Sequence, residues 1–355
     1  MNTTMTQPLV AFYRFLPTLA LGLIGGSIAY WLEMPLPWLL GAMITTTAAS
    51  LMGLRLRSPG RGRKGVLVVI GVMLGSAFTT DVSGDLLAWS TSLVIMLLAT
   101  AVMMLFSVWF SRRVAHYSMD TALYAGVPGG VSAVTGMALD SKADLRVVGM
   151  THAVRILILL VAIPPLLSGI GHVSLQPTGM SLDQWLWLPS PTDAAWLAGA
   201  GVLGAWLGQR LHLPNALLFG PALISTGLHL SGLTHASLPP SLIAMAQVVI
   251  GVSVGVRFAG TSLTEVRHTL VMATLQAVIL LVIALVAAWG IHALTGVSLA
   301  AALLAYMPGG APELSLVALS LGIDPAFVTS HHLLRITVLI LVLPLLLSYF
   351  QRVHV

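Results

Sequence analysis

The sequence predicts an all-α polytopic membrane protein built from two inverted repeats, and two observations lead to this prediction. First, hydrophobic residues make up 57% of the 355 residues and charged residues only 8%. A soluble domain carries about 25% charged residues, so most of this chain must face lipid or packed protein. Second, the second half of the chain repeats motifs of the first half.

The repeat is clearest at a helix-breaking motif. Pro128-Gly129-Gly130 recurs 180 residues later as Pro308-Gly309-Gly310. The following residues also recur, at offsets of 180 or 179: His152 and Arg155 as His332 and Arg335, Gly71, Gly75 and Phe78 as Gly251, Gly255 and Phe258, and Pro35 and Gly41 as Pro214 and Gly220. A repeat that holds breakers and ionisable residues in apolar sequence is typical of membrane transporters. We expect repeat 1 over residues 1–170, a linker rich in proline and glycine over 171–193, and repeat 2 over 194–355.

Each repeat contains five apolar runs that could form spans. A helix needs about 20 apolar residues to cross a bilayer. The ten runs are Phe15–Tyr30, Leu36–Leu54, Gly65–Phe78, Leu86–Phe110, Val147–Ser168, Ala195–Gly208, Ala216–Leu230, Leu242–Phe258, Thr269–Ala293 and Phe327–Tyr349. Several are short, which favours a packed bundle of tilted or broken helices. Gly71, Gly75, Gly251 and Gly255 are spaced for close helix packing.

Two further segments, Asp120–Asp140 and Leu299–Leu321, contain the Pro-Gly-Gly motifs. Proline removes a backbone donor and clashes with the preceding turn, and paired glycines disfavour helix. We therefore expect each segment to be unwound at the motif, as a broken helix or a re-entrant hairpin. Such a backbone persists at membrane depth only where it is buried in protein or lines a watery cavity.

The loop charges favour five spans per repeat, with both breaker segments re-entrant and the two repeats inverted. In that topology the cytoplasmic side holds Arg14, the Arg55–Lys64 cluster, Arg112, Arg113, Lys142, Arg146, Arg210, Arg257, Arg267 and Arg352, whereas Asp81, Asp85, Asp183, Asp193 and Asp324 lie outside. If both breaker segments crossed fully, five of those basic residues would lie outside. The positive-inside rule therefore selects the inverted arrangement.

Few residues could bind a ligand. Broken helices offer N-termini to an anion and free carbonyls to a cation, so Pro128, Gly129, Gly130, Pro308, Gly309 and Gly310 are candidates. Arg155 and Arg335 lie in apolar runs, where arginine costs roughly 2.5–3.5 kcal/mol to insert. They either hold an anion or brace free carbonyls. His152 and His332 lie three residues earlier, on the same helix face, and either contact the ligand or only bond a carbonyl.

Glu313 follows the second motif by three residues, where the first repeat has Ala133. Its carboxylate either pairs with Arg335 or binds a coupling proton or sodium ion. His331 has no counterpart, because Thr151 occupies the matching place.

The sequences Val127-Pro-Gly-Gly-Val-Ser and Met307-Pro-Gly-Gly-Ala-Pro-Glu-Leu, together with both His-x-x-Arg motifs, resemble the bacterial membrane AbrB family of "AbrB duplication" proteins over nearly the whole chain. Members are often labelled ammonia monooxygenase or regulator of gene expression. The resemblance implies a duplicated multi-pass protein of the bacterial inner membrane.

We expect a secondary transporter or exporter of a small anionic metabolite, with coupling to protons or to sodium left open. One alternative is a membrane sensor that affects gene expression indirectly. A metal-dependent monooxygenase is a more remote alternative, since no metal-ligand spacing is present, so we expect no enzyme, cofactor or metal. The expected partners are the lipid bilayer and a small-molecule or ion substrate, with no nucleic acid, and a homo-oligomer is left open.

Overall fold

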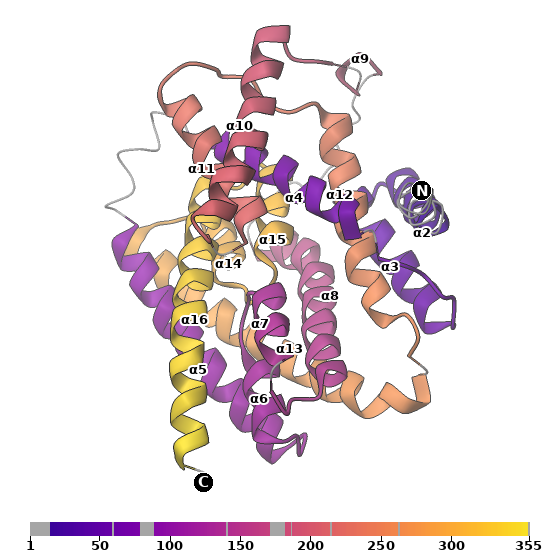
Figure 1. Ribbon diagram of the computed structural model, residues 1–355, viewed down its shortest axis with the longest axis vertical. Coiled ribbons are helices and arrows are strands. Elements are labelled where there is room, and N and C mark those ends of the chain that lie inside the picture. The colour runs from indigo at the N-terminus through magenta and orange to yellow at the C-terminus, as the bar shows by residue number, and fades with distance from the viewer. Residues whose placement is uncertain are drawn as a thin grey trace, which may run out of the picture. The chain divides into compact units, whose positions relative to one another are not determined.

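The computed structural model describes residues 15–58, 60–78, 89–139, 141–170, 182–185, 187–213, 215–261 and 263–353 (Figure 1). Within these ranges the chain forms helices and no strand, which confirms the predicted all-α class. Among the described residues, five helical stretches are long and apolar enough to cross a membrane: Ser90–Arg113, Leu145–Gly169, Pro240–Phe258, Val266–Thr295 and Pro325–Leu345. Other predicted spans, such as Ala216–Leu230, are shorter apolar helices. Asp81, Asp85, Asp140, Pro214 and residues 171–181 of the predicted linker lie outside the described ranges.

The chain divides into two compact units, and each unit contains segments from both halves of the sequence. The small unit comprises residues 1–67, 175–189 and 238–267. Its helices are α2 (Leu16–Trp31), α3 (Pro37–Leu51), α9 (Leu182–Trp185), α12 (Pro240–Gly255) and the 3-10 turn η2 (Val256–Phe258), with the first turns of α4 (Gly60–Gly75) and α13 (Leu263–Thr295).

The large unit comprises residues 68–174, 190–237 and 268–355. It holds the remainder of α4 and α13 together with α5 (Ser90–Arg113), α6 (Met119–Gly126), α7 (Val131–Ala138), α8 (Leu145–Ile170), α10 (Pro191–Arg210), α11 (Ala216–Leu230), α14 (Leu299–Tyr306), α15 (Ala311–Ser320) and α16 (Pro325–Val353).

In the small unit, α12 from the second half of the chain packs against α2 and α3 from the first half. The helices approach closely at glycines. A Cβ on Gly251 would lie 2.5 Å from the carbonyl oxygen of Leu39, and a Cβ on Gly255 would overlap Thr46. Gly25 and Gly41 bring α2 against α3 in the same way. Small residues allow such backbone contact, which larger side chains would prevent.

The large unit contains the matching contact, in which a helix from the first half of the chain packs against a helix from the second half. Residues 68–75 of α4 pack against α11, where a Cβ on Gly71 would overlap the carbonyl oxygen of Leu218 and one on Gly75 would overlap Ala222. Leu218 is the residue that matches Leu39 at the offset of 179. The close packing predicted for the glycines of both repeats is therefore confirmed.

The backbone also repeats at unusual conformations. Non-glycine residues with positive φ precede both α3 and α11: Leu36 (φ 52°) matches Asn215 (φ 48°), and Glu33 matches His212, both at φ 53°. A positive φ is uncommon for residues with a side chain, so its recurrence at a fixed offset is specific. The duplication seen in the sequence is thus also present in the local structure.

Helix caps recur in the part of the large unit that carries the breakers. Ser118 accepts a hydrogen bond from the backbone N–H of Thr121 at the start of α6, and Ser298 does the same for Ala301 at the start of α14. Such caps satisfy backbone donors that a helix leaves free at its N-terminus. At α10, Ser190 donates to the Asp193 carboxylate (2.7 Å), which lowers the pKa of that carboxyl group.

We expect Gly71→Ala and Gly251→Ala each to destabilise the protein by about 1–3 kcal/mol, because the added methyl group would push against a helix backbone. Unfolding of the purified protein in detergent, followed by circular dichroism, measures this. Gly199→Ala is the matched control: no atom lies within 4 Å of its Cβ position, so alanine there should be neutral or stabilising. Equal effects at all three positions would contradict the packing role.

Candidate functional site

Both Pro-Gly-Gly motifs interrupt a helix. Helix α6 ends at Gly126 and α7 begins at Val131, while α14 ends at Tyr306 and α15 begins at Ala311. Proline cannot donate a backbone hydrogen bond and glycine does not favour helix, so both segments leave the helical conformation at the motif. The breaks predicted from the sequence are therefore present at matching positions.

The two breaks use their glycines for different reasons. In the first, Gly129 (φ 139°) and Gly130 (φ 62°) adopt conformations that residues with a side chain rarely reach. In the second, Gly310 has ordinary extended angles (φ −76°, ψ 132°), but a Cβ there would overlap the Glu313 carboxylate. The first break therefore needs glycine for backbone freedom and the second for space.

The two arginines bond the carbonyl that precedes each break. Arg155 Nη2 donates to the Val127 carbonyl (2.9 Å), and Arg335 Nη1 donates to the Met307 carbonyl (2.5 Å). Val127 and Met307 occupy the same place in the two repeats, directly before the proline. Both arginines are 1% exposed. Interrupting a helix leaves backbone carbonyls without their usual partners, and the guanidinium groups supply replacement donors.

The two histidines bond carbonyls that lie three residues before the carbonyls bonded by the arginines. His152 Nε2 lies 3.0 Å from the Tyr124 carbonyl oxygen, and His332 Nε2 lies 3.1 Å from that of Leu304. A carbonyl only accepts, so Nε2 carries the proton in both rings. In the first repeat this leaves Nδ1 of His152 to accept from Arg155 Nη2 at 2.6 Å. Both histidines thus satisfy the last turn before a break.

The first break and the second His-x-x-Arg motif lie together in the large unit. A Cβ on Gly129 would be 3.9 Å from Arg335 Cδ and from Leu339 Cδ1. The structure therefore brings a predicted site residue from each repeat into one buried region.

Glu313 is buried in the first turn of α15, 3% exposed, and its Oε2 atom has no hydrogen-bond partner. The pair with Arg335 that the sequence left open is not formed, because the hydrogen bonds of Arg335 go to Met307, Ala305 and Met96. The second break therefore holds a buried carboxylate oxygen, Glu313 Oε2, that bonds no group of the protein.

Sequence reasoning gave little weight to His331, which the structure places in a buried polar cluster. His331 Nδ1 donates to the Phe327 carbonyl (2.8 Å), so its Nε2 accepts from Ser92 Oγ (2.8 Å). The Tyr306 hydroxyl donates to the Ser92 carbonyl (2.7 Å), which ties α5 to the end of α14. In the sequence, the one sign that this cluster is particular to the second repeat is that His331 has no counterpart in repeat 1.

The donor set does not favour a metal centre. Within the described ranges, no three His, Cys, Asp or Glu side chains are grouped so that they could hold a metal ion. His152 has both ring nitrogens engaged, and the Nε2 atom of His332 is bonded to a carbonyl.

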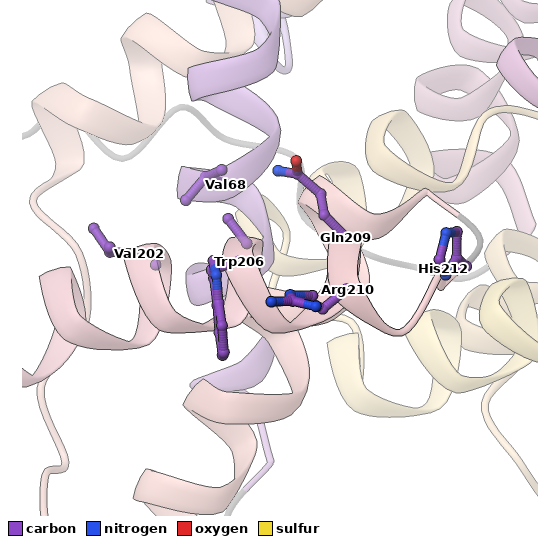
Figure 2. A pocket seen from close by; sticks show the side chains of 8 residues that line it. Val68, Val202, Trp206, Gln209, Arg210 and His212 are labelled. Atoms are coloured by element: carbon purple, nitrogen blue, oxygen red, sulfur yellow. The ribbon is translucent and has the colours of Figure 1, made fainter.

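A separate hollow lies along the C-terminal half of α10 (Figure 2). It is lined by Val68, Gly201, Val202, Ala205, Trp206, Gln209, Arg210 and His212. The Arg210 guanidinium lies 5.9 Å from the centre of the Trp206 ring. None of the site residues predicted from the sequence lines this hollow.

Comparison with known proteins yields one family and two similar proteins. The family model described as "Transition state regulatory protein AbrB" matches residues 38–351. The "Putative regulator AbrB" of Escherichia coli (strain K12) is 26% identical over 322 residues, which cover 90% of this chain and 91% of that protein. The "Uncharacterized protein YhjN" of Bacillus subtilis (strain 168) is 23% identical over 367 residues, covering 95% and 92%.

We expect the glycines of the two breaks to respond differently to alanine. Gly130→Ala should cost about 1–2 kcal/mol of stability because its φ is left-handed, whether or not Glu313 is truncated. Gly310→Ala should cost less than Gly130→Ala, because the overlapping Glu313 carboxylate ends a flexible side chain, and this cost should vanish in the Glu313→Ala background. Thermal unfolding measures this for Gly130→Ala and Gly310→Ala, each alone and combined with Glu313→Ala, with the natural protein and Glu313→Ala as the two references. A Gly310→Ala cost that persists without the Glu313 side chain would contradict the steric explanation.

Proposed function

We propose that this chain, which belongs to the AbrB family, is a secondary transporter or exporter of a small anion. The observation that supports this most directly is the Arg155 guanidinium, which is buried while its Nε and Nη1 atoms have no hydrogen-bond partner. Those two nitrogens carry three N–H bonds. The Arg335 side chain lies beside Gly129 of the first break, and its hydrogen bonds go to two carbonyls and a thioether rather than to a carboxylate.

Charge and hydrogen bonding both favour an anion at this place. Removing a charged group from water is expensive unless an opposite charge or a full set of hydrogen bonds replaces the water. The buried donors of Arg155 have neither. An oxyanion supplies a negative charge and acceptor oxygens at once. The adjacent break would let the ligand approach the backbone, as in transporters with discontinuous helices.

The proposed membrane arrangement is that of two inverted repeats in the bacterial inner membrane, with the breaker segments re-entrant from opposite sides. The apolar helices long enough to span support a membrane location, and the loop charges support the inversion. The bilayer and the transported ion are the partners this function requires, and it requires no enzyme chemistry, cofactor or nucleic acid.

Glu313 is the proposed coupling residue. Its Oε2 atom is buried without a partner at the second break. A carboxylate in this position gains stability by binding a proton or a sodium ion, because either one removes or balances the buried charge. Exchange of that ion between the two sides would couple anion movement to an ion gradient.

A sensor is the second candidate, and the name of the Escherichia coli relative as a regulator is the observation that favours it. A sensor would bind the same anion at Arg155 without moving it. Flux through a reconstituted membrane therefore separates the two functions, since only a transporter turns over.

We expect purified protein in liposomes to take up at least one of four labelled anions, namely acetate, succinate, phosphate or sulfate. Glu313→Gln should change how uptake depends on pH or sodium, because the titratable oxygen is lost while the side chain keeps its shape. Glu33→Gln, at an exposed loop position, is the matched control and should leave both dependences unchanged. Binding without uptake in the natural protein would favour the sensor, and unchanged ion dependence in Glu313→Gln would remove the coupling role.

The inverted topology predicts which loops face the cytoplasm. The natural chain has no cysteine, so single cysteines at Lys142 and Asp183, both exposed, can be labelled cleanly with a membrane-impermeant maleimide. On spheroplasts we expect labelling at 183 and none at 142. Six full crossings per half would give the reverse pattern, with 142 labelled and 183 protected, and would exclude re-entrant breaker segments.

A further inference from the structure

The two His-x-x-Arg motifs look equivalent in the sequence but differ in how fully their arginines are bonded. Arg335 uses all three of its side-chain nitrogens: Nη1 donates to the Met307 carbonyl (2.5 Å), Nη2 to the Ala305 carbonyl (2.8 Å) and Nε to Met96 Sδ (3.4 Å). Its guanidinium is therefore held from the second break on one side and from α5 on the other.

Arg155 uses one nitrogen only. Both hydrogens of Nη2 are engaged, one by the Val127 carbonyl (2.9 Å) and one by His152 Nδ1 (2.6 Å). Nε and Nη1 are buried and bond nothing. The difference at Nε has a cause in the sequence, because Gln276 stands where the repeat offset places the counterpart of Met96, the partner of Arg335 Nε. The Gln276 amide donates instead to the Ser107 carbonyl and to Ser111 Oγ.

From this asymmetry we infer that Arg155 alone contacts the transported anion, whereas Arg335 is a structural brace that fixes the second break. The inference rests on the proposed function and divides roles that the sequence gave to both arginines. His152 is then a positioning residue. By accepting from Nη2 it fixes the guanidinium so that Nε and Nη1 remain available.

The geometry also restricts the ligand. A guanidinium can grip a carboxylate with two parallel bonds along the Nε–Nη2 edge or the Nη1–Nη2 edge. Both edges include Nη2, whose hydrogens are already engaged in Arg155. The anion is therefore held through single N–H···O contacts from Nε or Nη1. This favours a small oxyanion held by separately placed N–H donors of the guanidinium over a ligand that depends on a two-point fork.

A matched pair of substitutions tests the division of roles. Arg155→Lys and Arg335→Lys both keep the charge and both remove the guanidinium donors. The measurement is the unfolding temperature of each purified protein in detergent, titrated separately with the sodium salts of acetate, succinate, phosphate and sulfate at constant ionic strength. The anion that stabilises the natural protein most is used to obtain an apparent affinity.

For Arg155→Lys we expect an apparent anion affinity at least tenfold weaker, with a smaller loss of stability in the absence of the anion. For Arg335→Lys we expect a clear fall in the unfolding temperature without the anion and an affinity within about threefold of the natural protein. His152→Phe, which cannot accept from Nη2, should weaken anion binding as Arg155→Lys does.

The outcomes separate the inference from the proposed function. If none of the four anions stabilises the natural protein, the proposed anion transporter is itself contradicted. If an anion binds the natural protein but Arg155→Lys binds it equally well, or Arg335→Lys loses as much affinity as Arg155→Lys, only the division of roles is overturned. Should Arg335→Lys not fold at all, Arg335→Gln with added Met96→Leu provides a second brace variant, in which retained affinity supports the inference and lost affinity overturns it.

Discussion

The rest of the site depends on the hydrogen bonds from two buried guanidinium groups to the carbonyls that precede the breaks. A chain can leave the helical conformation inside a dry protein only if the backbone groups it frees find other partners. Arg155 and Arg335 supply those partners at Val127 and Met307, and His152 supplies one at Tyr124. Without these donors, Pro-Gly-Gly would leave buried carbonyls unpaired. The arginines are thus needed for the breaks before any ligand is considered.

Both helix breaks and their bonding partners could largely be predicted from the sequence, because the duplication places the same residues at matching positions in both halves. In each repeat the histidine and the arginine lie 28 residues beyond the carbonyls they bond, so matching breakers implied matching partners. The sequence could not show which nitrogen bonds which carbonyl, because that depends on side-chain rotamers. It also could not show that Gly130 is needed for a left-handed backbone and Gly310 for space, since both are simply glycine in the same motif.

Composition predicted the helical class but not the way the halves combine. Apolar runs indicate where helices lie, yet they carry no information on which helix accepts which neighbour. In the structure, the third helix of each half packs against helices of the other half, so that Gly251 contacts Leu39 and Gly71 contacts Leu218. The glycines four residues apart indicated close packing, but their partners lie in the opposite half. Only the tertiary structure specifies that choice, because the contact joins segments of widely separated sequence.

The residues that differ between the two repeats suggest different roles for the two halves. Arg335 donates to two carbonyls and a thioether, and the partial negative charges of these groups stabilise its positive charge. Arg155 lacks those partners, so its charge is available to a ligand. Two buried ionisable residues near the second break, Glu313 and His331, have no counterpart in the first half, which has Ala133 and Thr151 at the matching places. In the proposed transporter the first half would therefore hold the anion and the second the coupling ion. That arrangement uses one duplicated scaffold for two kinds of charge, since matched backbone breaks serve both halves and only the side chains around them differ.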